Sequence, residues 1–286
     1  MDKKLELGVY SMSIDILQDK IRKAKNPSAL VLEAFPGLLP PACSFKDYYT
    51  QLLTQLKGLI PAVRFGFGSF ALAPGGLEDL RELSQEAKAL GYYVILDAPE
   101  LLSPQAAENL AQSLDNWTWD GLVISPWLGS DVMKPFLDLC KQGKAVFCAV
   151  RTGNRSAAEL QDLLSGSRLV HTAAADIVTR YAEQAMGKMG YSQLGAMASA
   201  GSADGLKNLR AKYQRLFLLV DGYDYSFGNS KNCAQAFDKL GRGAVVCAGS
   251  SIAGAWKEAE GLEPVEAAVE AAQKMKRNLT RYITVL

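Results

Sequence analysis

The stretch "VILDAPELLSP", residues 94–104, contains one junction between a strand and a helix. An apolar run of strand character ends at Asp97, and Ser103 opens a segment with helical periodicity. The carboxyl end of such a strand is where an α/β protein carries its chemistry. The number of such strand–helix units along the chain therefore indicates the fold. Whether Asp97 takes part in catalysis depends on which residues lie beside it.

Segments like the run before Asp97 recur along the whole chain. Eight strand candidates lie at 29–34, 62–67, 93–98, 121–126, 145–150, 192–198, 216–222 and 244–249. Amphipathic segments lie between them, at 45–59, 76–91, 103–114, 130–143, 202–214 and 229–241. This alternation predicts parallel strands joined by crossover helices, and eight strands that are apolar throughout favour a closed (β/α)8 TIM barrel over an open sheet.

The composition is that of a globular protein, with 49% of the 286 residues hydrophobic and 21% charged. We expect a single barrel domain over residues 1–286. A leading helix at 11–25 precedes the first strand, and an extra helix near 169–188 separates the fifth strand from the sixth.

Charge and cysteine content exclude several classes of partner. Lys and Arg number 31 against 30 Asp and Glu, with the signs interspersed, so neither nucleic acid nor an anionic membrane is an expected partner. No run approaches the ~18 apolar residues of a membrane span, and the start of the chain has no signal-type stretch. Five cysteines without a paired motif are expected to be buried thiols. These features predict a cytoplasmic protein that binds a small molecule or another protein.

Polar residues follow the predicted strands at their carboxyl ends. They are Glu33, Arg64, Asp97, Glu100, Ser125, Asp131, Arg151, Thr152, Asn154, Asp221, Tyr223, Asp224, Ser250 and Ser251. So many acids could hold a divalent metal, because hard cations take carboxylate oxygens, or they could cap the helices that follow. We favour the caps and predict neither a metal site nor a cofactor.

Four segments carry a resemblance to a known family. They read LVLEAFPGLLP (30–40), AVRFGFGSFALAPGG (62–76), VISPWLGSDVMKPFL (123–137) and VFCAVRTGNRSAAELQDL (146–163). In order and spacing they resemble orotidine 5′-phosphate decarboxylase, especially its longer bacterial form with an extra helix after the fifth strand. The resemblance covers most of the chain. It implies a (β/α)8 barrel, a homodimer with active sites at the interface, a pyrimidine nucleotide ligand and no cofactor.

The family's catalytic array is altered in this chain. Decarboxylation leaves a carbanion on the pyrimidine, which the family protonates from a lysine within a Lys-Asp-Lys-Asp array, written mostly as LDAKRGDIG. On this pattern Asp97 keeps the first acid, whereas Pro99 replaces the lysine and Leu102 the second acid. The second-strand lysine falls on Arg64 and the first-strand acid on Glu33. An arginine keeps the charge but does not readily release a proton, and a proline does neither.

The family's phosphate grip is altered as well. The family uses a loop of the type PGYGAQGG after the seventh strand and an arginine just past the eighth. Here the loop reads DGYDYSFG from Asp221, which keeps Gly222 and Tyr223 but adds carboxylates at Asp221 and Asp224. The arginine falls on Ser250. Two added negative charges are expected to repel a phosphate dianion.

Two further positions follow from the fifth strand and the extra helix. Thr152 and Asn154 match a loop that lines the family's pyrimidine site, so the resemblance implies that they contact a ligand. His171 is the only histidine in the chain. We expect a helix-surface or packing residue and not a general base, because a Ser-His triad would need His171 to meet a serine by chance.

Together, these changes suggest a decarboxylase-type barrel that has lost its decarboxylase chemistry, a pseudoenzyme that serves as a scaffold or small-molecule binder. Asp97 and Arg64 would be remnants of the catalytic array, and a homodimer with Leu102 at its interface is expected. Two alternatives stay open. The chain could be an active lyase that converts orotidine 5′-phosphate to UMP in pyrimidine biosynthesis, or it could carry out a different, metal-assisted lyase or aldolase-type reaction at the same site.

Overall fold

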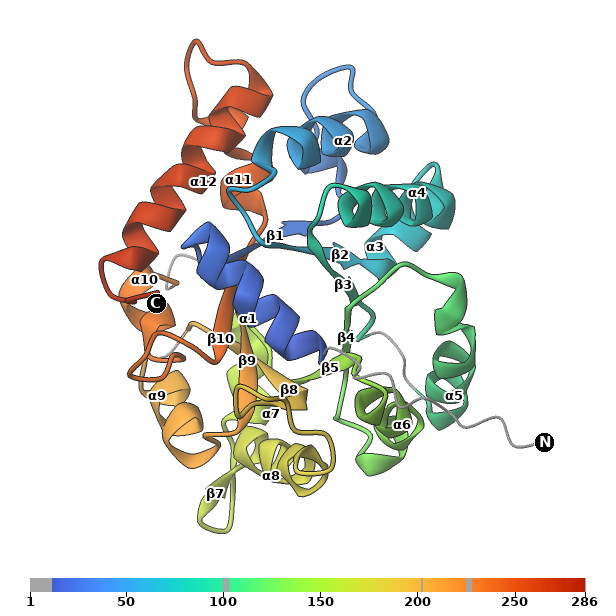
Figure 1. The fold of residues 1–286 in the computed structure, drawn as a ribbon, viewed down its shortest axis with the longest axis vertical. Coiled ribbons are helices and arrows are strands. Elements are labelled where there is room, and N and C mark those ends of the chain that lie inside the picture. Colours follow the sequence, from blue (N-terminus) through green and yellow to red (C-terminus); the bar gives the residue numbers. More distant parts are fainter. Residues whose placement is uncertain (1–11, 100–102, 202, 225–227, 286) are drawn as a thin grey trace, which may run out of the picture.

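Eight parallel strands form a closed barrel in the computed structural model, which describes residues 12–99, 103–201, 203–224 and 228–285 (Figure 1). The strands are β1 Ser28–Leu32, β2 Ala62–Gly66, β3 Tyr93–Asp97, β4 Gly121–Ile124, β5 Ala145–Arg151, β8 Ser192–Ser199, β9 Leu216–Asp221 and β10 Ala244–Ala248. They close in the order β1-β10-β9-β8-β5-β4-β3-β2. Every predicted strand is present, with ends within two residues of the expected ones. The predicted (β/α)8 barrel is confirmed.

Helices surround the barrel, and most follow a strand as predicted (Figure 1). They are α1 Ser13–Ala24, α2 Phe45–Leu56, α3 Phe67–Ala71, α4 Gly76–Ala89, α5 Pro104–Ser113, α6 Leu137–Lys141, α7 Ala158–Gln161, α8 Val170–Ala182, α9 Ala203–Lys212, α10 Ser230–Ala234, α11 Ser250–Ala253 and α12 Pro264–Thr280. The leading helix is α1 and the extra helix is α8. A short antiparallel hairpin, β6 Leu164–Ser165 with β7 Arg168–Leu169, precedes α8 and was not predicted.

Three predicted helices are shorter than their sequence pattern indicates, and one of them, the extra helix expected near 169–188, ends at Ala182. Residues 130–143 form two 3-10 turns, η3 Ser130–Val132 and η4 Lys134–Phe136, before α6. Pro135 has no backbone N–H and so interrupts helical hydrogen bonding there. Residues 229–241 contain only α10, since the backbone then turns around Asp238, whose carboxylate accepts hydrogen bonds from the N–H groups of Leu240 and Arg242.

Strand alternation divides the core into two layers. Inward-facing side chains such as Tyr93 and Ile95 fill the barrel interior, and their neighbours Val94 and Leu96 pack against the surrounding helices. This alternation explains why the strands are apolar at every position: both faces are covered. Among the described helices, none is both long and apolar enough to cross a lipid bilayer.

Helix α1 lies across the barrel and closes the end opposite the βα loops (Figure 1). Ile14, Leu17 and Ile21 pack into the interior cluster. Two buried polar residues attach the helix to the barrel rim: the Ser13 hydroxyl donates to the carbonyl of Asp120, and the Gln18 side chain accepts a hydrogen bond from a backbone N–H. The chemistry is therefore confined to the other end of the barrel.

Because Leu17 is fully buried beneath the barrel interior, we expect Leu17→Ala to lower the free energy of unfolding by about 2–5 kcal/mol. Lys23→Ala on the exposed side of the same helix is the control and should change it by less than about 0.5 kcal/mol. Urea unfolding followed by circular dichroism measures both. Equal effects of the two substitutions would show that α1 does not seal the barrel.

Candidate active site

The same alternation directs several charged side chains into the open end of the barrel. Tyr93 and Ile95 of β3 face inward, so Asp97 takes the next inward position at the carboxyl end of the strand. Arg64 takes an inward position on β2, in register with Ile95 of β3, and Asp221 ends β9. Strand ends far apart in the sequence therefore bring a cation and two acids together.

Arg64 forms ion pairs with both acids. Its Nε lies 3.1 Å from Oδ2 of Asp97, and its Nη1 lies 3.1 Å from Oδ1 of Asp221. Arg64 is 6% exposed and Asp97 is 7% exposed, so little water screens these charges. Burial opposes the guanidinium charge, but Asp97 and Asp221 favour it and raise the pKa of Arg64 well above its usual value. Arg64 is a permanent cation that holds the two carboxylates in place.

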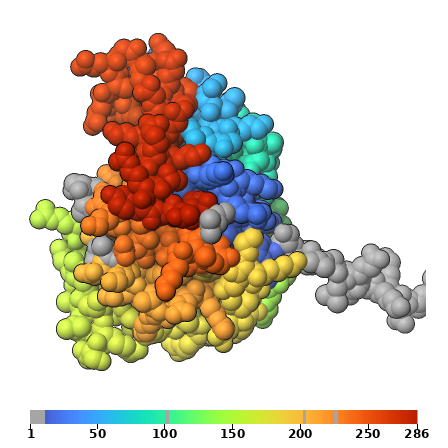
Figure 2. All heavy atoms as spheres, turned by 60° about the vertical axis from the view of Figure 1, so that its left-hand side comes forward, coloured from blue at the N-terminus to red at the C-terminus, as the bar shows by residue number. Residues whose placement is uncertain are grey.

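A cavity of about 410 Å³ opens above this ion-pair network at the mouth of the barrel. Four of the predicted site residues line it: Glu33, Arg64, Gly222 and Ser250. The charged residues Asp221, Asp224 and Lys257 line it as well. Lys257 belongs to the turn η6, Ala255–Lys257, and the segment from η6 into α12 projects from one end of the molecule (Figure 2). The open end of the barrel thus contains a cavity lined by the acids Glu33, Asp221 and Asp224.

Asp224 fills a cradle of backbone amides beside this cavity. Its Oδ2 accepts hydrogen bonds from the N–H groups of Gly249 at 2.6 Å and Ser250 at 3.1 Å, and its Oδ1 accepts one from Ser251 at 3.2 Å. These amides lie at the start of α11, where a carboxylate is favoured by the unpaired N–H groups of the first turn. The carboxylate predicted to repel an anion instead occupies an anion-binding position itself.

Two glycines shape the loop that carries Asp224. Gly222 has φ +84°, a left-handed conformation that glycine adopts without strain. A Cβ on Gly228 would lie 2.0 Å from the carbonyl oxygen of Gly222, so only glycine fits where the loop returns to its start. Tyr223 is half-buried and lines, with Ser250, an adjoining groove beneath α12. Both predicted loop residues, Gly222 and Tyr223, are thus beside the mouth.

Thr152 and Asn154 are not among the residues that line the barrel mouth. The Thr152 hydroxyl donates to Oδ1 of Asn154 at 2.7 Å, and Asn154 lines a separate cavity outside the barrel. The pairing of β5 with β8 shifts register between Ala149 and Arg151. A bulge of this kind changes the direction of the side chains that follow it, which explains why Arg151 at the end of β5 points away from the mouth.

Some predicted features fall outside the site or outside the described residues. Pro99 lies two residues after Asp97 and is half-buried. Glu100 and Leu102, including the predicted interface position, lie outside the described residues. In the part of the chain that the structure describes, no three His, Cys, Asp or Glu side chains gather closely enough to hold a metal ion.

Sequence reasoning missed three features of the site: the Arg64–Asp221 pair, the cradle around Asp224 and the presence of Lys257. The pair joins residues 157 positions apart. The cradle had a weak signal in the Gly249–Ser250–Ser251 run after a strand, since small residues leave backbone amides accessible. Nothing in the sequence around Lys257 predicts that this residue lines the mouth.

We expect Arg64→Met to lower the free energy of unfolding by about 3–5 kcal/mol at pH 7, because it leaves two neighbouring carboxylates without their cation. The triple variant Arg64→Met, Asp97→Asn, Asp221→Asn removes those charges as well and should recover most of the loss. Urea unfolding measures both proteins. A triple variant no more stable than Arg64→Met would mean that the charges do not determine the stability of the network.

No family model matches the chain. An orotidine 5′-phosphate decarboxylase of Rhodopirellula baltica is 28% identical over 229 residues, covering 77% of this chain and 76% of the relative. One of Dehalococcoides mccartyi is 25% identical over 284 residues, covering 92% of this chain and 97% of the relative.

The fold agrees with these sequence relatives. A candidate orotidine-monophosphate-decarboxylase from Toxoplasma gondii superposes on the chain with a TM-score of 0.79 at 18% sequence identity. The superposition covers 96% of this chain and 100% of that one. By its sequence the chain is similar to orotidine 5′-phosphate decarboxylases, and it shares their barrel fold.

Proposed function

We propose that this chain is a decarboxylase-family barrel that has lost the decarboxylase chemistry and binds a small molecule other than a nucleotide monophosphate. The observation that carries the proposal is the position of Arg64, buried between Asp97 and Asp221. It stands where the resemblance implies a lysine, and the acids on its two sides, Asp97 and Asp221, form ion pairs with it.

Arg64 is unsuited to the proton transfer that the family's reaction needs. A general acid works best when its pKa lies near the operating pH. The pKa of Arg64 is raised well above its usual value by Asp97 and Asp221, which outweigh the opposing effect of burial. A carbanion at the mouth of the barrel would meet a fixed cation that does not give up its proton.

The amide cradle is unsuited to a phosphate because it is already filled. Asp224 takes three backbone N–H groups, and Ser250 stands where the resemblance implies an arginine. Binding energy from a remote phosphate contributes to catalysis when it is used to stabilise the reacting centre. Losing that contribution lowers both affinity and rate.

The charges at the mouth indicate which ligands fit. Glu33, Asp221 and Asp224 line the cavity against the cations Arg64 and Lys257, so acids outnumber bases there. A dianion would be repelled by this balance, whereas a neutral or cationic molecule would not. We therefore infer a polar ligand without a phosphate group.

The alternative is an active orotidine 5′-phosphate decarboxylase, which the names of the relatives favour. It would need a proton donor other than Arg64. Among the described residues that line the mouth, Lys257 is the one lysine, and its ammonium lies over the ring of Trp256, 5.8 Å from the centroid. Lys257 is therefore the residue on which an active enzyme would depend.

We expect the purified protein to leave orotidine 5′-phosphate unchanged, with turnover well below the ~1 s⁻¹ at the lower end of the ordinary enzyme range. Loss of pyrimidine absorbance measures the reaction, in protein prepared from a host that lacks its own decarboxylase. Turnover in that range that disappears in Lys257→Met would establish the active enzyme instead. The substitution of an exposed lysine is not expected to affect folding.

We expect Asp224→Ala to gain affinity for inorganic phosphate, because the substitution vacates three backbone N–H groups. Phosphate at about ten times its Kd should raise the Tm of this variant by about 2–4 °C and leave the native protein unchanged. Glu258→Ala removes an equal charge from the adjoining groove without vacating the amides, so it should show no shift. An equal shift in the native protein would contradict the proposal that Asp224 blocks the cradle.

A further inference from the structure

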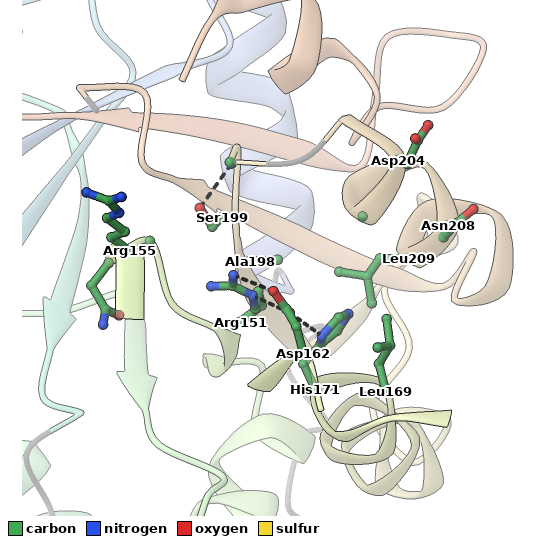
Figure 3. A pocket seen from close by; sticks show the side chains of 14 residues that line it. Arg151, Arg155, Asp162, Leu169, His171, Ala198, Ser199, Asp204, Asn208 and Leu209 are labelled. Carbon is green, nitrogen blue, oxygen red and sulfur yellow. Dashed lines mark hydrogen bonds and ion pairs between the residues drawn. The ribbon is translucent and has the colours of Figure 1, made fainter. Parts of the chain in front are cut away.

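A second cavity lies outside the barrel mouth, between the ends of β5 and β8 and the helices α8 and α9 (Figure 3). Its volume of about 500 Å³ is within the range of small-molecule sites. None of the described residues lines both this cavity and the mouth. The two cavities are therefore separate candidate sites.

His171 presents a hydrogen-bond acceptor to this cavity. It is 7% exposed, and its Nδ1 lies 2.9 Å from the carbonyl oxygen of Gln161 and 3.2 Å from Oδ1 of Asp162. Both neighbours only accept hydrogen bonds, so in the neutral form of the ring Nδ1 carries the proton and Nε2 is an acceptor. No described residue bonds to Nε2, and the ring lines the cavity (Figure 3).

Asp162 and Arg151 fix the orientation of this ring. Arg151 donates to both carboxylate oxygens of Asp162, from Nε and Nη2, each at 2.9 Å (Figure 3). Hydrogen bonding and charge from Arg151, with a smaller contribution from His171, lower the pKa of Asp162 despite its partial burial. Asp162 stays ionised, and its partnership with Arg151 holds the His171 acceptor in one direction before any ligand arrives.

The remaining walls are apolar on one side and cationic at the rim. Leu169, Ala198 and Leu209 contribute the apolar surface. Arg155 is exposed at the rim and forms no ion pair with any described residue, whereas the charge of Arg151 is offset by Asp162. Asp204 lies across the cavity from Arg155 (Figure 3), so an anionic group is favoured on the Arg155 side.

We propose that this cavity is a binding site for a small organic monocarboxylate with an apolar body and one N–H or O–H donor. The donor bonds to Nε2 of His171, the body packs on the leucine side, and the carboxylate pairs with Arg155. Each part of the ligand is matched by one wall: an oriented acceptor, an apolar surface and an uncompensated cation.

The probe is indole-3-acetate, which carries all three groups, and the reporter is His171 itself. Because the chain has one histidine, ¹⁵N-histidine labelling gives a single imidazole in the NMR spectrum. Indole-3-acetate should shift the Nε2 resonance saturably. Phenylacetate lacks the N–H and should bind about three- to tenfold more weakly. A probe that causes no saturable shift, or phenylacetate that binds equally well, overturns the proposal.

Variants locate the binding. Asn208→Trp places a large ring at the exposed rim and should abolish the shift, whereas Lys207→Trp, on the neighbouring exposed position outside the cavity, should not. Arg155→Gln should weaken binding about two- to fivefold. Asp224→Ala should leave the affinity for indole-3-acetate unchanged, which separates this site from the barrel mouth. Equal losses in both tryptophan variants, or a loss in Asp224→Ala, contradict the assignment.

Discussion

A guanidinium inside a β-barrel is the constraint on which the open end of this protein depends. A buried charge costs several kcal/mol unless partners of opposite sign compensate it with good geometry. Arg64 meets that requirement through Asp97 on one side and Asp221 on the other, each at 3.1 Å. The three strands that supply these residues are thereby held in one arrangement. Their side chains are engaged with one another through these ion pairs.

Polar groups in the loop after β9 likewise find their hydrogen-bond partners within the chain. Backbone N–H groups at a helix start need an acceptor, and in a binding site that acceptor is the ligand. Here Asp224 provides it from within the chain. Gly222 and Gly228 allow the loop to close tightly enough for this reach. The backbone amides at the start of α11 are therefore occupied by a carboxylate from within the chain.

The strands and the leading helix could be predicted from the sequence because their signals are local. A short apolar run that ends in a turn residue, such as residues 216–222, is typical of a buried strand. The partner of Arg64 could not be predicted, because two acids of equal character, Asp97 and Asp221, reach it from strands distant in the sequence. The hydrogen bonds of Asp224 could not be predicted either. Its charge predicts repulsion of a phosphate, but only the folded loop shows which backbone amides lie within reach of its carboxylate.

The bulge in β5 determines the direction of Arg151, the polar side chain that ends this strand. Strict alternation from Phe147 and Ala149 would turn the next polar side chain into the barrel, toward Arg64. The register shift between Ala149 and Arg151 instead accompanies a guanidinium that binds Asp162 outside the barrel. An alignment preserves the order of residues but not the direction of their side chains, so Asn154, which matches the pyrimidine loop in order, lines a different cavity. The change of direction at one strand end, together with the extra helix that carries the histidine, creates a site that the rest of the barrel neither requires nor obstructs.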